Sequence, residues 1–160
     1  MKKLTIIYAI TAAILVQFPL GYFFISLEGL VLGHGFIGIP NGFELYLISI
    51  LVVSAFIIIV IGTPLYFTLK HYKLNTSLYI TISGLIIPIL IMTFIDFGIT
   101  SYKGYSAGEN YYGTYRDTFI DGQRTFWGWV KVLESMVTYG IHGVLGAIIF
   151  HKIYLKGNNA

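Results

Sequence analysis

The chain contains no cysteine and few charged residues. Of its 160 residues, 11% are Asp, Glu, Lys or Arg, whereas soluble domains carry about 25%. The absence of cysteine excludes disulfides, thiol redox chemistry, iron–sulfur ligation and c-type haem attachment. The shortage of charge, together with 56% hydrophobic residues and several apolar runs of membrane-spanning length, indicates an integral membrane protein.

Common catalytic and cofactor-binding patterns are also missing from the sequence. There is no phosphate-binding loop, HExxH pattern or nucleophile–base arrangement. A bis-histidine haem site would need a second histidine at the depth of His142, but His34, His71 and His151 fall in an outer loop or at the inner surface. We therefore predict no catalytic residue, no cofactor and no metal, and we favour a protein that is not an enzyme.

Four apolar segments define the predicted architecture, an all-α integral membrane protein with one domain over residues 1–160. The four helices are expected to pack as one antiparallel bundle. The predicted spans cover about residues 4–26, 45–69, 77–100 and 126–150. Residues 27–44 form a glycine-rich, apolar outer loop that is expected to be re-entrant or to lie at the membrane interface. Residues 101–125 form a tyrosine-rich outer loop, in which a short amphipathic helix is expected around Tyr111 to Ile120.

The distribution of lysine and arginine predicts the orientation. The amino terminus, the connection over residues 70–76 and the tail each carry two, and the loop over residues 27–44 carries none. The positive-inside rule then places both termini in the cytoplasm and both long loops outside. Lys103, Arg116 and Arg124 oppose this assignment. The short connections and the lack of a targeting signal favour the inner membrane of a bacterium, with a eukaryotic organelle as the alternative. The net charge of +3 does not indicate nucleic acid, because the basic residues lie at helix ends.

The last predicted span carries an unusual set of polar residues. Lys131, Ser135, Thr138 and His142 follow steps of four, three and four residues, so they share one helical face, with Glu134 at its edge. Ionisable groups inside a span are costly, normally point into the protein, and by default mark a functional site.

Depth along each span predicts which polar side chains meet. Counted from the outer helix ends at about 1.5 Å per residue, Asp96 and Lys131 lie at the same level and are expected to form an ion pair. His142 lies deeper and is expected to hydrogen-bond within the bundle. The full predicted polar cluster, opening outward as a vestibule, consists of Asp96, Lys131, Glu134, His142, Gln17, Ser54 and Thr93. A purely structural ion-pair network is the alternative interpretation.

Two further features bear on association with other proteins. Gly143 and Ala147 form a small-xxx-small pair, which predicts close helix packing and leaves a homo-oligomer as an alternative. The outer loop is rich in tyrosine and arginine, which are enriched at interface hot spots. The predicted partner-binding residues are Tyr105, Tyr111, Tyr112, Tyr115, Arg116 and Phe119.

These features favour a small inner-membrane protein that acts by protein–protein interaction. It is expected to be an accessory subunit of a membrane complex or an immunity-type protein, with the lipid bilayer and a membrane or periplasmic protein as partners. The alternative is an oligomeric proton- or ion-coupled transporter that uses Glu134, Lys131, Asp96 and His142.

Overall fold

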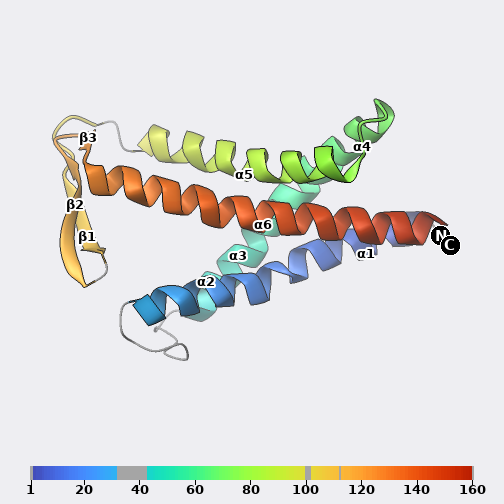
Figure 1. The fold of residues 1–160 in the computed structure, drawn as a ribbon, viewed down its shortest axis with the longest axis horizontal. Coiled ribbons are helices and arrows are strands. Elements are labelled where there is room, and N and C mark those ends of the chain that lie inside the picture. The colour runs from blue at the N-terminus through green and yellow to red at the C-terminus, as the bar shows by residue number, and fades with distance from the viewer. Residues whose placement is uncertain (1, 32–42, 100–101, 112, 160) are drawn as a thin grey trace.

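Four long apolar helical segments dominate the structure (Figure 1). The structure, a computed structural model, describes residues 2–31, 43–99, 102–111 and 113–159. Within these residues, the segments long and apolar enough to cross a membrane are Leu4–Leu27, Glu44–His71, Ser77–Asp96 and Phe126–Gly157. The prediction of a multi-pass membrane protein with four candidate spans is confirmed by length and composition. Most of the first predicted outer loop, including His34, lies outside the described residues.

The first segment consists of two helices, α1 (Lys2–Leu15) and α2 (Gln17–Val31). They meet at Val16. The N–H of Val16 still donates to the carbonyl of Ala12, four residues earlier, at 3.1 Å. Pro19 has no N–H to donate to the carbonyl of Leu15, so the regular bonding pattern is interrupted at this point. The sequence predicts one interrupted span here, and the structure places the interruption just before the proline.

The second segment also departs from a regular α-helix. It consists of α3 (Phe43–Ile57), a π-helical turn η1 (Ile58–Gly62) and α4 (Thr63–His71). The N–H of Thr63 bonds the carbonyl of Ile58, and the Thr63 hydroxyl donates to the same oxygen at 2.8 Å. Pro64 follows and has no N–H to donate. The hydrogen-bonded turn before it contains one extra residue, as in a π-helix. The sequence predicts a distortion at Gly62-Thr63-Pro64, and the π-helical turn ends there.

Helix α6 (Phe126–Asn159) is the axis of the molecule, with α5 (Ser77–Ile99) on one side and α1 on the other (Figure 1). A Cβ atom on Gly84 of α5 would lie 2.6 Å from both the Gly143 carbonyl oxygen and the Ala147 Cβ of α6. Only glycine permits this approach, so the small residues on α6 pack against α5 within one chain, in agreement with the predicted close helix packing. Both chain ends lie at the same end of the molecule.

The outer loop contains a three-stranded antiparallel sheet, formed by β1 (Ala107–Tyr111), β2 (Thr114–Ile120) and β3 (Gln123–Arg124) in that order. Asp121 and Gly122 connect β2 and β3 with φ values of 50° and 77°, as a two-residue hairpin turn of type I′ requires. The amphipathic helix expected around Tyr111 to Ile120 is therefore wrong, and the fold is mostly helical rather than all-α.

The best-packed core lies toward the end that holds both termini. It consists of Ala9, Ala13, Tyr66, Ile80, Phe150 and Tyr154. Elsewhere large apolar side chains are exposed, such as Phe94 at 84%. Apolar surface outside a well-packed core is expected where lipid tails replace water.

Candidate functional site

A cavity of about 320 Å³ lies between the sheet and the adjoining ends of α5 and α6. Its polar lining comes from all three parts: Thr93 and Asp96 on α5, Lys131 and Ser135 on α6, and Glu109 on β1. Arg124, at the end of β3, also lines it. The volume falls at the lower end of the range for small-molecule sites, about 300–1,000 Å³. We call this space the outer cavity.

An ion pair between Arg124 and Asp96 connects the sheet to α5. The Arg124 Nη2 atom lies 2.5 Å from Asp96 Oδ2, and 3.4 Å from the Asp96 carbonyl oxygen. The Arg124 side chain is 8% exposed, and its guanidinium lies 4.8 Å from the centre of the Phe119 ring. The predicted Asp96–Lys131 pair is therefore wrong: Arg124, two residues before the start of α6, lies beside Asp96 and pairs with it instead.

Lys131 pairs instead with Glu109 of β1. The Lys131 side chain is 50% exposed and that of Glu109 is 34% exposed. The two carboxylates are about equally accessible, and the pairs differ in the cation, which is exposed in Lys131 and buried in Arg124. Since the sheet folds over the start of α6, it supplies a carboxylate from outside the predicted spans. The outer cavity thus holds two carboxylates and two cations, which balance in charge.

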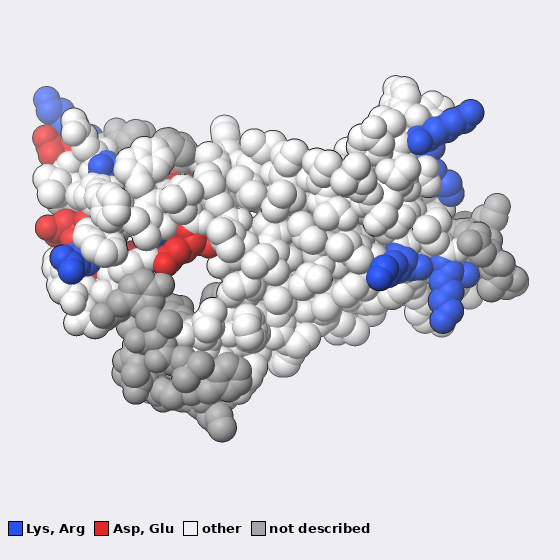
Figure 2. Space-filling model, in the orientation of Figure 1, with Lys and Arg blue, Asp and Glu red and all other residues white. Residues whose placement is uncertain are grey.

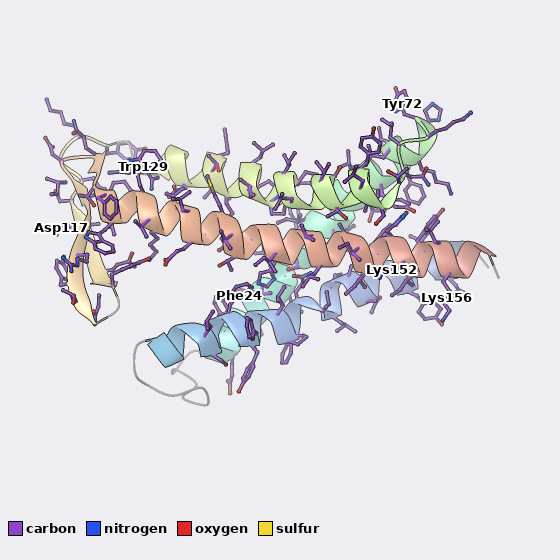
Figure 3. All side chains as sticks on the ribbon, in the orientation of Figure 1. Phe24, Tyr72, Asp117, Trp129, Lys152 and Lys156 are labelled. Atoms are coloured by element: carbon purple, nitrogen blue, oxygen red, sulfur yellow. The ribbon has the colours of Figure 1, made fainter. Side chains whose placement is uncertain are left out.

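A second cavity of about 280 Å³, the inner cavity, is lined by residues of all six α-helices and of the π-helical turn η1. Gln17 and His142 meet at its wall: His142 Nδ1 lies 2.6 Å from Gln17 Oε1. The Gln17 amide nitrogen donates to the carbonyl oxygens of Ala13 at 3.0 Å and His142 at 3.3 Å. The Phe24 ring lies 5.5 Å from the His142 ring (Figure 3). Gln17 is buried, so these bonds satisfy a polar group that would otherwise be costly in a membrane.

The seven residues of the predicted polar cluster separate into two groups. Thr93, Asp96 and Lys131 line the outer cavity, and Gln17, Ser54 and His142 line the inner cavity. Glu134 is exposed on α6. The Thr93 hydroxyl donates to the carbonyl of Ile89 in its own helix at 2.7 Å, and Gln17 bonds to His142.

The polar face of α6 lines both cavities in succession. Lys131 and Ser135 belong to the outer cavity, and Thr138 and His142 belong to the inner cavity. The four residues that the sequence places on one helical face therefore lie on the face of α6 that borders the two cavities.

The predicted partner-binding residues occupy different environments in the sheet. Tyr115 is 67% exposed and Tyr105 is 42% exposed. Tyr111 and Phe119 are buried, with 9% and 8% of their surface accessible. Their rings contact Trp127 and Tyr105, respectively. These two residues were expected on the binding surface, but they anchor the sheet instead.

Two further predicted residues complete this set. Arg116 is exposed, and its guanidinium lies 4.8 Å from the centre of the Trp127 ring. Tyr112 lies outside the described residues.

The sheet is held firmly on the helical bundle. The hydroxyl of Thr118 donates to the carbonyl of Ala107 at 3.1 Å, and the N–H of Thr125 donates to the Thr118 carbonyl at 3.0 Å. A Cβ atom on Gly128, in the first turn of α6, would collide with that same carbonyl. The glycine therefore lets the β2 backbone rest directly on the helix.

The opposite end of the molecule contains a second group of polar contacts. Tyr66 Oη lies 3.1 Å from His151 Nδ1, and Lys70 Nζ donates to Tyr154 Oη at 3.0 Å. All of these residues pack into or beside the core. Among the described residues, no group of three or more His, Cys, Asp or Glu side chains is placed to hold a metal ion.

The residues that sequence reasoning missed are Glu109 and Arg124. Both lie in the segment that the sequence predicts as a loop, so counting residues along the predicted helices assigns them no depth. The turn residues Asp121 and Gly122 carry the signal that was available, since an Asp-Gly pair between β-forming residues predicts a hairpin. A hairpin directly before α6 predicts that charged side chains of this segment lie close to the start of α6.

Comparisons of the chain with protein-family models, curated proteins and solved structures give no match.

Proposed function

We propose that this protein is a small multi-pass membrane protein that acts by binding another membrane or periplasmic protein through its sheet. The observation that carries the proposal is a sheet, packed on the start of α6, that presents Tyr105, Tyr115 and Arg116 outside the candidate membrane-spanning segments. Tyrosine and arginine contribute strongly to binding when a partner excludes water from them. An accessory subunit of a membrane complex, or an immunity-type protein that neutralises a toxin, would act in this way.

The charge distribution supports an orientation with both termini in the cytoplasm. Lysines gather at the end that holds the termini, whereas the sheet end carries acidic and basic residues together (Figure 2). The lysines at the terminal end include Lys70, Lys73, Lys152 and Lys156. Under the positive-inside rule this end faces the cytoplasm and the sheet faces outward. We place the protein in the inner membrane of a bacterium.

Partner capture from native membranes tests this function. A variant with Tyr105→Ser and Tyr115→Ser removes exposed aromatic surface without touching the buried ring of Tyr111. We expect the variant to insert normally and to lose the co-purifying partner. Tyr72→Ser is the matched control, because Tyr72 is 68% exposed at the opposite end (Figure 3). Equal recovery of the partner with all three proteins would contradict the proposal.

A second candidate function is an oligomeric proton- or ion-coupled transporter. The specific observation in its favour is the polar face of α6, which borders the outer cavity through Lys131 and the inner cavity through His142. Reconstituted vesicles with a pH-sensitive dye inside would test it. Ion-coupled flux that is present in the natural protein and absent in Glu134→Gln would favour the transporter over the binding function.

A further inference from the structure

The outer cavity has the position and the charge pattern of a lipid headgroup site. It lies where the spans end and the sheet begins, beside aromatic residues such as Tyr105 and Trp129. Tyrosine and tryptophan side chains gather at the headgroup level of a bilayer. We propose that the outer cavity binds the headgroup of a zwitterionic phospholipid with a primary amine, phosphatidylethanolamine.

The exposed ion pair joins a cation on a candidate span to a carboxylate on the sheet, which is the order of charges that this headgroup needs. Lys131 projects from α6, within a membrane-spanning segment, whereas Glu109 projects from β1 outside those segments. In phosphatidylethanolamine the phosphate lies next to the lipid tails and the ammonium lies further out. The phosphate therefore faces the Lys131 ammonium, and the lipid ammonium faces the Glu109 carboxylate.

The Lys131–Glu109 pair is suited to exchange with a ligand. Because both side chains are at least one-third exposed, their mutual attraction is screened and contributes little to stability. A zwitterion inserted between them replaces one ion pair by two charge-assisted hydrogen bonds. The buried Arg124–Asp96 pair does not need to open, and it holds the sheet above the cavity while the ligand binds.

The apolar wall of the same cavity fits the part of the lipid next to the headgroup. Met92, Val132 and Met136 line it on the side of the spans. They offer apolar contact where the glycerol and the first carbons of the tails would lie, and methionine adapts its shape readily. The site therefore combines charge recognition on one side with apolar contact on the other.

The headgroup chemistry predicts a ranking among lipids. Phosphatidylglycerol has the phosphate and lacks the cation, so it leaves Glu109 without its partner. Phosphatidylcholine has a cation without N–H groups, so it cannot donate a hydrogen bond to the carboxylate. Loss of one charge-assisted hydrogen bond weakens binding by about tenfold. We expect both lipids to bind about tenfold more weakly than phosphatidylethanolamine.

Native mass spectrometry of the full-length protein in mild detergent tests the proposal. The protein is titrated with synthetic phosphatidylethanolamine, phosphatidylglycerol and phosphatidylcholine that carry identical tails. The key variant exchanges the two charges, Lys131→Glu with Glu109→Lys, which keeps an ion pair and reverses its direction. Lys131→Gln is a milder second variant, and Lys152→Gln, at the opposite end (Figure 3), is the control. Tryptophan fluorescence establishes that each variant is folded.

The expected result is a preference for phosphatidylethanolamine that is present in the natural protein and in Lys152→Gln. The preference disappears in the charge exchange, whereas Lys131→Gln weakens the binding of all three lipids about tenfold, because each of them carries the phosphate. Equal retention of the three lipids by the natural protein overturns the proposal, as does an unchanged preference in the charge exchange or an unchanged affinity in Lys131→Gln. A third arm uses free phosphoethanolamine. If it binds as tightly as the lipid, the tails contribute nothing and a soluble zwitterion replaces the lipid as the ligand.

Discussion

The ion pair between Arg124 and Asp96 should hold the sheet on the helical bundle, and its contribution can be measured. Arg124 is almost fully buried, so its charge depends on the Asp96 carboxylate at 2.5 Å. A hydrogen bond to a charged group contributes about 1.5–3 kcal/mol. Asp96 is 32% exposed, which places the expected value near the middle of that range. We expect a coupling energy of about 2 kcal/mol between the two side chains.

A double-mutant cycle isolates this coupling from the other contacts of Arg124. The guanidinium also lies over the Phe119 ring, so Arg124→Gln alone removes more than the ion pair. The cycle combines Arg124→Gln, Asp96→Asn and the double variant. The coupling energy is the difference between the loss of stability in the double variant and the sum of the losses in the two single variants. Denaturant unfolding in detergent is followed by tryptophan fluorescence. Both tryptophans of the chain, Trp127 and Trp129, lie at the start of α6, so they report on the sheet.

The exposed pair in the same cavity provides the internal comparison. The cycle of Lys131→Gln and Glu109→Gln should give a coupling below about 1 kcal/mol, because exposed ion pairs contribute little. A coupling below about 0.5 kcal/mol for Arg124–Asp96, or one no larger than that of the exposed pair, would refute the reasoning from burial.

Three further predictions concern the helices and the orientation. Gly143→Leu should force α5 away from α6 and lower the free energy of unfolding by about 1–3 kcal/mol, measured as a lower midpoint in thermal unfolding; an unchanged midpoint would mean that the helices do not approach closely. Gln17→Leu should cost about 0.6–1.7 kcal/mol, because the hydrogen bonds to His142 are lost, and a stabilised variant would count against them. Since the chain has no cysteine, Tyr115→Cys should react with a membrane-impermeant maleimide in intact cells and Tyr72→Cys only after permeabilisation, whereas the reverse pattern would invert the topology.

The helical segments were predictable because each apolar run is long and its ends are marked by polar residues. The structure adds length at the ends, notably in α6, which continues to Asn159. The sheet was missed because residues 101–125 contain many glycine and charged residues, a composition that also fits a loop. Its hairpin signal, Asp121-Gly122, is only two residues long. A local turn preference of this kind is easily overlooked when the surrounding segment is interpreted as an irregular connection.

The sequence predicts the level of Asp96 and Lys131 along their helices, but it does not predict their ion-pair partners. Asp96 and Lys131 do line one cavity, as their equal distance from the outer helix ends predicts. Each nevertheless pairs with a residue of the sheet, because Arg124 and Glu109 return to the helix ends through tertiary contacts. Counting along helices gives a level for each residue; it gives no information on side chains that arrive from a folded extramembrane segment.

The length of α6 has a mechanical consequence. Its 34 residues extend over about 51 Å at 1.5 Å per residue, whereas the hydrocarbon core of a bilayer is about 30 Å thick. The sheet rests on the first turn of this helix, and the last turn carries Lys156. One continuous helix therefore links the sheet to the lysine-rich end, so a force that tilts the sheet would be transmitted along α6 to that end without passing through a loop.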